Sequence, residues 1–216
     1  MTFFIVCGMV LFMKFDLHVH TTLSPCSRLS LEEILFSAAA RGLDGVCITD
    51  HDTMAVRHCL REGIQNNGLS VIFGMEYTTS EGDFLLFGPF EDLPPGLPAK
   101  LLLRHVERCG GVAVGAHPFR KGRSVREHLV RDELCGIVEG VNGRNSEQEN
   151  KSVVKWQQQF NIPLVGGSDA HLPAELGRVF TRFRSPVRSR NDLIHALKQG
   201  SFDHVASEKT FSRQAA

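Results

Sequence analysis

The 216-residue chain has no excess of charge of either sign, because 24 lysines and arginines balance 24 aspartates and glutamates. This balance argues against a broad electrostatic surface for DNA or a membrane, so any basic site must be local and long nucleic acid is not the expected partner. The chain also lacks a Cys-x-x-Cys pair, and several of its six scattered cysteines lie in apolar segments. We expect reduced thiols in a cytoplasmic protein.

Hydrophobic runs long enough to cross a bilayer are missing as well. The apolar segment 2–12 is too short for a spanning helix and has neither the basic region nor the cleavage site of a signal peptide. Because Met13 directly precedes the first predicted strand, we interpret residues 1–12 as an N-terminal extension from an upstream start codon; an extra edge strand or an association surface is the alternative. Without a domain-length repeat or a low-complexity linker, residues 13–216 are predicted to form one domain.

Strand-like and helix-like segments alternate beyond that extension. Apolar runs predict strands at 14–19, 44–49, 70–75, 112–116, 136–141, 162–166 and near 201–206, with 84–87 as a candidate hairpin partner of the third. Amphipathic patterns predict helices over 31–41, 97–109, around 153–160 and around 193–197. Ser30 and Glu33 form a capping box for the first helix. This alternation predicts a parallel sheet of about seven strands.

Short clusters of His, Asp and Glu follow five of these strands. They are Asp16-Leu17-His18-Val19-His20, Thr49-Asp50-His51-Asp52, Gly74-Met75-Glu76, Gly115-Ala116-His117-Pro118 and Gly167-Ser168-Asp169-Ala170-His171. Imidazole and carboxylate are ligands that zinc, manganese and iron share. A barrel brings every strand end to one rim, so ligands from this many strands predict a small barrel. Each cluster alone has an ordinary structural explanation, but their shared placement favours a multinuclear metal hydrolase.

The order His-x-His, Thr-Asp-His-Asp, Glu, Ala-His-Pro and Gly-Ser-Asp-Ala-His resembles the PHP family, named for its polymerase-associated and histidinol-phosphatase members. The resemblance extends from Met13 to about Gly177. It implies a single-domain α/β fold, a distorted seven-stranded TIM-like β/α barrel, with two or three divalent metal ions (Mn, Zn or Fe), that hydrolyses phosphate esters. By matching position it implies these metal ligands: His18, His20, His51, Glu76, His117, Asp169 and His171. Asp50 would be a catalytic residue that contacts the metals or supports their ligands.

Two positions depart from the family pattern. Many members carry a further metal-binding His where this chain has Leu85, and Asp83 is the nearby residue that could compensate. In the loop after His20, Cys26 could ligate a soft ion or only pack the loop. We therefore expect two metal ions, with any third ion held more weakly.

The predicted reaction is hydrolysis of a small phosphomonoester, or of a nucleotide or oligonucleotide phosphate, by hydroxide that the metal ions generate. Arg120 and Arg144 are the expected clamps on the remaining phosphate oxygens, because a guanidinium offers a bidentate fork. One alternative is an amidohydrolase-type C–N hydrolase, which often uses a bridging Lys where this chain has Glu76. The other alternative is a non-catalytic metal-binding accessory domain. The oligomeric state stays open.

Overall fold

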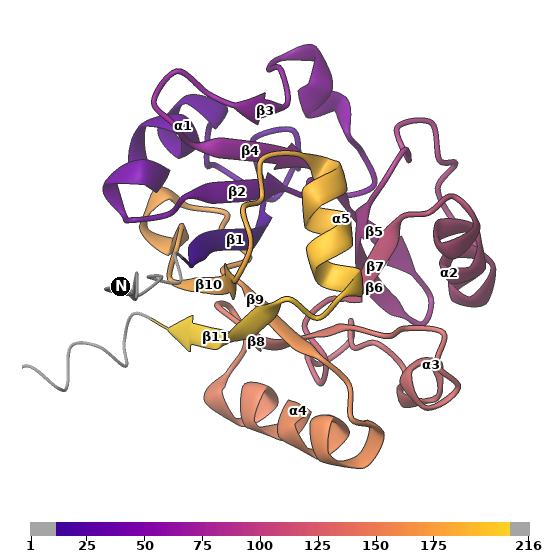
Figure 1. Cartoon of the computed structure of the whole chain (residues 1–216). Coiled ribbons are helices and arrows are strands. Elements are labelled where there is room, and N and C mark those ends of the chain that lie inside the picture. The colour runs from indigo at the N-terminus through magenta and orange to yellow at the C-terminus, as the bar shows by residue number, and fades with distance from the viewer. Residues whose placement is uncertain (1–11, 208–216) are drawn as a thin grey trace, which may run out of the picture.

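The computed structural model describes residues 12–207, which form eleven strands, five α-helices and two short 3-10 helices (Figure 1). The interpretation of residues 1–12 as an extension therefore concerns residues that, apart from Phe12, lie outside the described part of the chain. None of the described helices is long and apolar enough to cross a membrane. The five cysteines in this part are free thiols.

One sheet contains six strands in the order β11–β10–β1–β2–β4–β3. Their bounds are β1 (Met13–Val19), β2 (Gly45–Ile48), β3 (Gly63–Ile64), β4 (Ser70–Phe73), β10 (Val179–Phe183) and β11 (Phe202–Ser207). β1, β2 and β4 are parallel, so their carboxyl ends lie at one edge. Helix α1 (Leu31–Ala40) joins β1 to β2 and begins with the predicted Ser30–Glu33 capping box. The 3-10 helix η1 (Ala55–His58) follows β2.

The other sheet contains five strands in the order β5–β6–β7–β8–β9. Their bounds are β5 (Met75–Thr79), β6 (Gly82–Phe87), β7 (Val112–Gly115), β8 (Val138–Asn142) and β9 (Leu164–Gly167). β5, β6 and β7 are antiparallel, whereas β7, β8 and β9 are parallel. The remaining helices are α2 (Ala99–Arg108), α3 (Glu127–Arg131), α4 (Glu147–Phe160), η2 (Pro173–Glu175) and α5 (Arg190–Lys198).

The predicted seven-stranded β/α barrel is wrong, because the strands within residues 12–207 form two mixed sheets that do not close. The chain crosses from one sheet to the other at Gly74, where an added Cβ would lie 2.6 Å from the carbonyl oxygen of Leu86. Within residues 12–207 two isolated bridges link the sheets by strand pairing, His51–Glu76 beside this crossing and Val19–Ala170 between the ends of β1 and β9. The hairpins of β5, β6 and β7 replace the βαβ units that a barrel requires.

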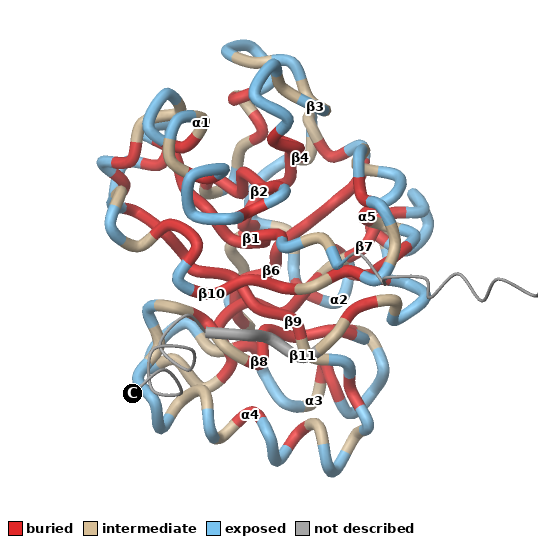
Figure 2. The backbone as a smooth tube through the Cα atoms, turned by 60° about the vertical axis from the view of Figure 1, so that its left-hand side comes forward, coloured by how far each residue is buried: buried red, intermediate tan, exposed pale blue. Residues whose placement is uncertain are grey.

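An apolar cluster joins the two sheets despite this incomplete pairing. It includes Phe15 and Ile72 from the first sheet and Leu85, Val114 and Val165 from the second. Burying each such side chain contributes on the order of 1.5–3 kcal/mol, so packing adds to the few hydrogen bonds that join the sheets. Figure 2 shows the buried residues concentrated in the strands and the exposed ones on the outer helices and loops.

Candidate active site

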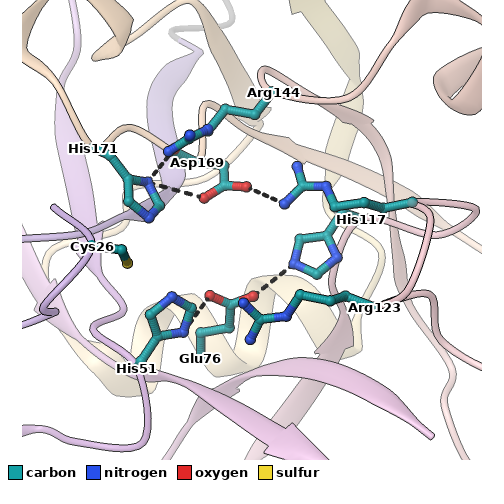
Figure 3. Close-up of a pocket in the computed structure, with 9 residues that line it drawn as sticks. Cys26, His51, Glu76, His117, Arg123, Arg144, Asp169 and His171 are labelled. Atoms are coloured by element: carbon teal, nitrogen blue, oxygen red, sulfur yellow. Dashed lines mark hydrogen bonds and ion pairs between the residues drawn. The ribbon is translucent and has the colours of Figure 1, made fainter.

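The predicted strand-end clusters meet in one cavity of about 360 Å³ (Figure 3). It is lined by Cys26, His51, Glu76, His117, Arg120, Arg123, Arg144, Asp169 and His171. Two further predicted residues, His18 and His20, lie fully buried in contact with Glu76 and Asp169. The structure therefore brings together all seven residues that the family resemblance implies as ligands.

Glu76 is the centre of this group. It follows the sheet crossing at Gly74 and its side chain is 1% exposed. Its Oε1 lies 2.7 Å from Nε2 of His117, and its Oε2 lies 3.0 Å from Nδ1 of His51. The same Oε2 lies 3.2 Å from Nε2 of His20 and 3.4 Å from Nε2 of His18. One buried carboxylate thus contacts four imidazoles, which come from both sheets.

The partners of His18 and His20 fix which ring nitrogen carries the proton. Nδ1 of His18 lies 3.0 Å from the Glu139 carboxylate, so this nitrogen donates. The Ser24 hydroxyl donates to Asp50 at 2.6 Å, so Nδ1 of His20, 3.1 Å from that hydroxyl, must donate to it. In neutral rings both Nε2 atoms then carry lone pairs, and these atoms face each other at 3.0 Å. A cation between them would remove this repulsion.

Asp169 and His171 extend the group from the end of β9. Asp169 Oδ1 lies 3.4 Å from Nε2 of His20, and its Oδ2 accepts a 2.8 Å hydrogen bond from Arg120. His171 Nδ1 donates to the backbone oxygen of Asp169 at 2.9 Å, which leaves its Nε2 as an acceptor. Asp169 and His117 have φ values of 56° and 31°, in the left-handed region that side chains other than glycine rarely adopt. Such backbone strain is typical of functional sites.

The carboxylates of this cluster are ionised although they are buried, which by itself would favour their neutral form. Burial opposes ionisation of Glu76, but the surrounding histidines, His18 first, hold its pKa well below the usual range. Burial likewise opposes protonation of His18, yet the carboxylates of Asp169, Glu139 and Glu76 raise its pKa well above the usual range. Burial and the neighbouring His20 lower the pKa of His171 to about 4. The ionised carboxylates of this cluster therefore need positive charge beside them, which a bound cation would supply.

These side chains fit divalent metal ions by the chemistry of their donors. Three groups have ligand atoms within 4.8 Å of one another. They are His20, His51 and His171; His18, His20 and Asp169; and Glu76, Asp83 and His117. In addition, Nδ1 of the buried His117 has no hydrogen-bond partner within the described residues. Converging imidazole and carboxylate groups, with histidines oriented through their second nitrogens, are typical of a metal centre.

Asp50 lies behind these residues and does not line the cavity. One of its oxygens accepts from Thr21 N at 2.7 Å and Ser24 Oγ at 2.6 Å, and the other accepts from Thr21 Oγ1 at 2.7 Å. Ser24 in turn contacts the ring of His20 and accepts from the backbone N of His51 at 3.0 Å. Asp50 thus holds the loop that orients two histidines.

The three arginines of the cavity differ in their contacts. Arg120 donates to Asp169, to Asn145 at 2.8 Å and to Asn142 at 2.7 Å, so each of its nitrogens is engaged. Arg123 forms an ion pair with Asp83 at 2.7 Å. The exposed side chain of Arg144 has no hydrogen bond or ion pair with any residue between 12 and 207. Arg144 is therefore the most available of the three for a ligand.

Sequence reasoning missed Arg123 and Glu139. Glu139 is 1% exposed in the middle of β8, where its oxygens contact His18 Nδ1 at 3.0 Å and His117 N at 2.7 Å. A lone glutamate within the apolar run 136–141 was an available signal, because a buried carboxylate needs partners. Arg123 had no comparable signal, since its loop carries several other basic residues.

The chain is similar in sequence to several known proteins. A family model described as PHP-associated matches residues 147–202. An uncharacterized protein of Methanocaldococcus jannaschii is 32% identical over 123 residues, which cover 50% of this chain and 68% of that protein. A phosphoribosyl 1,2-cyclic phosphate 1,2-diphosphodiesterase of Eggerthella lenta is 41% identical over 169 residues. That match covers 77% of this chain and 49% of the relative, so it spans about half of that enzyme.

A solved structure has the same fold. The lesion-specific endonuclease Q of Pyrococcus furiosus matches with a TM-score of 0.62 and 19% identity, over 88% of this chain and 56% of that one. At this identity the likeness concerns the fold alone.

Proposed function

Because the chain belongs to the PHP family and is a metal-dependent phosphoric ester hydrolase, we propose that it hydrolyses a small phosphorylated substrate in the cavity around Glu76. The observation that carries this proposal is the contact of one buried carboxylate with four imidazoles, beside three arginines in the same cavity. Metal ligands and fixed positive charge are what phosphoryl transfer requires at one place.

The proposed cofactor is a pair of divalent ions, manganese, zinc or iron. The residues that would hold them are His18, His20, His51, Glu76, His117, Asp169 and His171. When bound, such ions supply an activated water and neutralise charge on the phosphoryl oxygens. Glu139 and Asp50 keep the rings of His18 and His20 in the tautomers that turn Nε2 toward Glu76 and Asp169.

The arginines divide the remaining work. Arg144 is proposed as the clamp on phosphate oxygens, because its side chain borders the cavity and has no hydrogen bond or ion pair with the described residues. Arg120 was predicted as a second clamp; because its nitrogens contact Asp169, Asn142 and Asn145, we propose that it positions the Asp169 carboxylate. The cavity volume of about 360 Å³ is in the range of small-molecule sites, which supports a nucleotide-sized or smaller substrate.

The test is a hydrolysis screen of protein loaded with Mn²⁺, using panels of small phosphomonoesters and phosphodiesters, an oligonucleotide and an amide panel. We expect turnover of at least one small phosphate ester, and its loss in His20→Ala with an unchanged circular dichroism spectrum. Turnover confined to amides would support the amidohydrolase alternative, and turnover confined to the oligonucleotide would contradict a small substrate. A metal-loaded protein that hydrolyses none of them would support the accessory-domain alternative.

A further inference from the structure

Strand β6 carries, next to the cavity, a buried carboxylate that the proposed pair of metal ions does not use. In the antiparallel register Glu76 pairs with Leu85 and Thr78 with Asp83, so these four side chains share one face. Leu85 is fully buried in the apolar cluster between the sheets and offers no ligand. Asp83, two residues earlier, lies with Oδ2 3.7 Å from Nε2 of His117. Asp83 therefore completes a third group with Glu76 and His117.

Arg123 already occupies the space beside this group. Its Nε lies 2.7 Å from Oδ2 of Asp83, and an Nη2 hydrogen bond of 3.3 Å reaches Thr78 Oγ1. Figure 3 shows the Arg123 side chain lying next to the carboxylate of Glu76 and the ring of His117. A cation thus sits against Asp83, one of the three side chains that could otherwise share a metal ion.

The backbone around Arg123 is held against β6, so this placement is built into the fold. Arg126 N donates to Glu81 O at 2.9 Å, which ties the loop to the β5–β6 turn. Gly82, with φ of 119°, allows the loop to come so near that an added Cβ would lie 2.5 Å from Cα of Val125. The loop therefore cannot carry Arg123 away from Asp83 without breaking these contacts.

The contact between Arg123 and Asp83 is electrostatic and leaves part of the arginine free. Oδ2 of Asp83 has no hydrogen bond of acceptable geometry within the described residues, so the tie is an ion pair. The Asp83 side chain is 2% exposed, and a carboxylate so buried needs a cation beside it. The Arg123 side chain is 45% exposed and lines the cavity, so its outer nitrogens are accessible to a ligand.

We propose that Arg123 serves as the third cation of this site. Its guanidinium neutralises Asp83, keeps a third metal ion from binding beside Asp83, and contributes its Nη1 to a phosphate oxygen of the substrate. This role rests on the proposed function. It makes the protein a two-metal enzyme in which a fixed guanidinium, which cannot dissociate, stands where a third ion would bind.

The first test counts metal ions, a readout that does not depend on activity. Manganese per chain is measured by mass spectrometry after Mn²⁺ loading and dialysis, for the wild type, Arg123→Met, Asp83→Asn, the double variant and Arg126→Met. Arg126→Met is the control because it removes an exposed arginine from the same loop. We expect three ions in Arg123→Met and two in each of the other proteins. Two ions in folded Arg123→Met, three in the wild type, or loss of an ion in Asp83→Asn would each overturn the proposal.

The second test measures kcat and KM for phosphate ester hydrolysis, at a Mn²⁺ concentration that fills two metal sites per chain. We expect Arg123→Met to lower kcat/KM roughly tenfold or more, chiefly through KM, because a phosphate contact is lost. Arg123→Lys should retain two ions and recover part of the loss, and Arg126→Met should match the wild type. An unchanged kcat/KM in Arg123→Met would refute the substrate contact. A wild type that binds two ions yet hydrolyses no phosphate ester would refute the proposed function, while the metal counts would still decide whether Arg123 excludes a third ion.

Discussion

The substitution Glu139→Gln isolates the contribution of a residue that touches no cavity surface yet orients two histidines. Glu139 accepts from His18 Nδ1 on Oε1, and from His117 N and Asn142 Nδ2 on Oε2. Glutamine has nearly the same shape but only one oxygen. If that oxygen keeps the two donors at the Oε2 position, the amide NH₂ faces His18 Nδ1. The ring of His18 must then accept on Nδ1 and carry its proton on Nε2.

This change of tautomer determines the expected magnitude. A protonated Nε2 cannot ligate, so His18 would no longer serve the proposed metal pair. Loss of a group that orients a metal ligand typically costs about 10–100-fold in metal affinity, or about 1.4–2.8 kcal/mol. We expect the upper part of this range, since a His18 ring that carries its proton on Nε2 loses the ligand atom itself and not only the support of that atom.

The assay is titration of metal-free protein with Mn²⁺, followed by calorimetry, for the wild type, Glu139→Gln and Glu107→Gln. Glu107 is exposed on α2 and does not line the candidate site, so its substitution makes the same chemical change outside that site. We expect weaker Mn²⁺ binding and lower phosphatase activity in Glu139→Gln alone, with an unchanged fold by circular dichroism. Wild-type affinity in Glu139→Gln would show that Glu139 does not set the tautomer of His18.

Three further outcomes are expected. His20→Ala and Asp169→Ala should abolish turnover and reduce bound metal while the circular dichroism spectrum stays native, because neither side chain packs the apolar core; retained turnover in either would contradict metal-dependent hydrolysis here. Arg144→Ala should lower kcat/KM, with a loss of transition-state stabilisation of about 2–4 kcal/mol, and should leave the metal content unchanged; steady-state kinetics and metal analysis measure both. Gly82→Ala should lower the melting temperature measured by calorimetry, since its Cβ would lie 2.5 Å from Cα of Val125; an unchanged melting temperature would mean that the loop yields freely.

Local patterns in the sequence predicted the parallel parts of the fold well. β1, β2 and α1 follow their predicted ranges closely. Residues 84–87 do form a hairpin strand within β6, but their partner is β5 and not the strand predicted at 70–75. In each case the pattern reflects a local requirement, either an apolar run that must be buried or a cap that satisfies free N–H groups. The convergence of the His, Asp and Glu clusters was also predictable. Each cluster directly follows a strand, so the clusters meet in any fold that brings these strand ends together, whether or not the sheet closes into a barrel.

The sheet topology was not predictable in the same way. The run after Ser70 was expected to be one strand, but Gly74 divides it between two sheets, a consequence of tight packing against Leu86 that no local pattern reports. β10 was missed because Val179–Phe183 mixes polar and apolar residues. This strand is stabilised by antiparallel pairing with β1, at the other end of the chain, where Met13 pairs with Phe183 and Phe15 with Thr181. The pairing of Arg123 with Asp83 is likewise a long-range contact set by the loop that follows His117.

The two sheets meet along two seams beneath the candidate site, one between the ends of β1 and β9 and the other between the residues after β2 and strand β5. Little backbone pairing bridges either seam. The bridges Val19–Ala170 and His51–Glu76 are their ladder contacts, and proposed ligands stand on both sides of each one. An ion held by His20 and Asp169 would therefore be a cross-link between two sheets as well as a reagent. Metal loading should slow amide hydrogen exchange at His20 and Glu76, whose backbone N–H groups donate across the seams, more than in the centre of either sheet. Cohesion of the fold and competence for chemistry would then depend on the same few bonds.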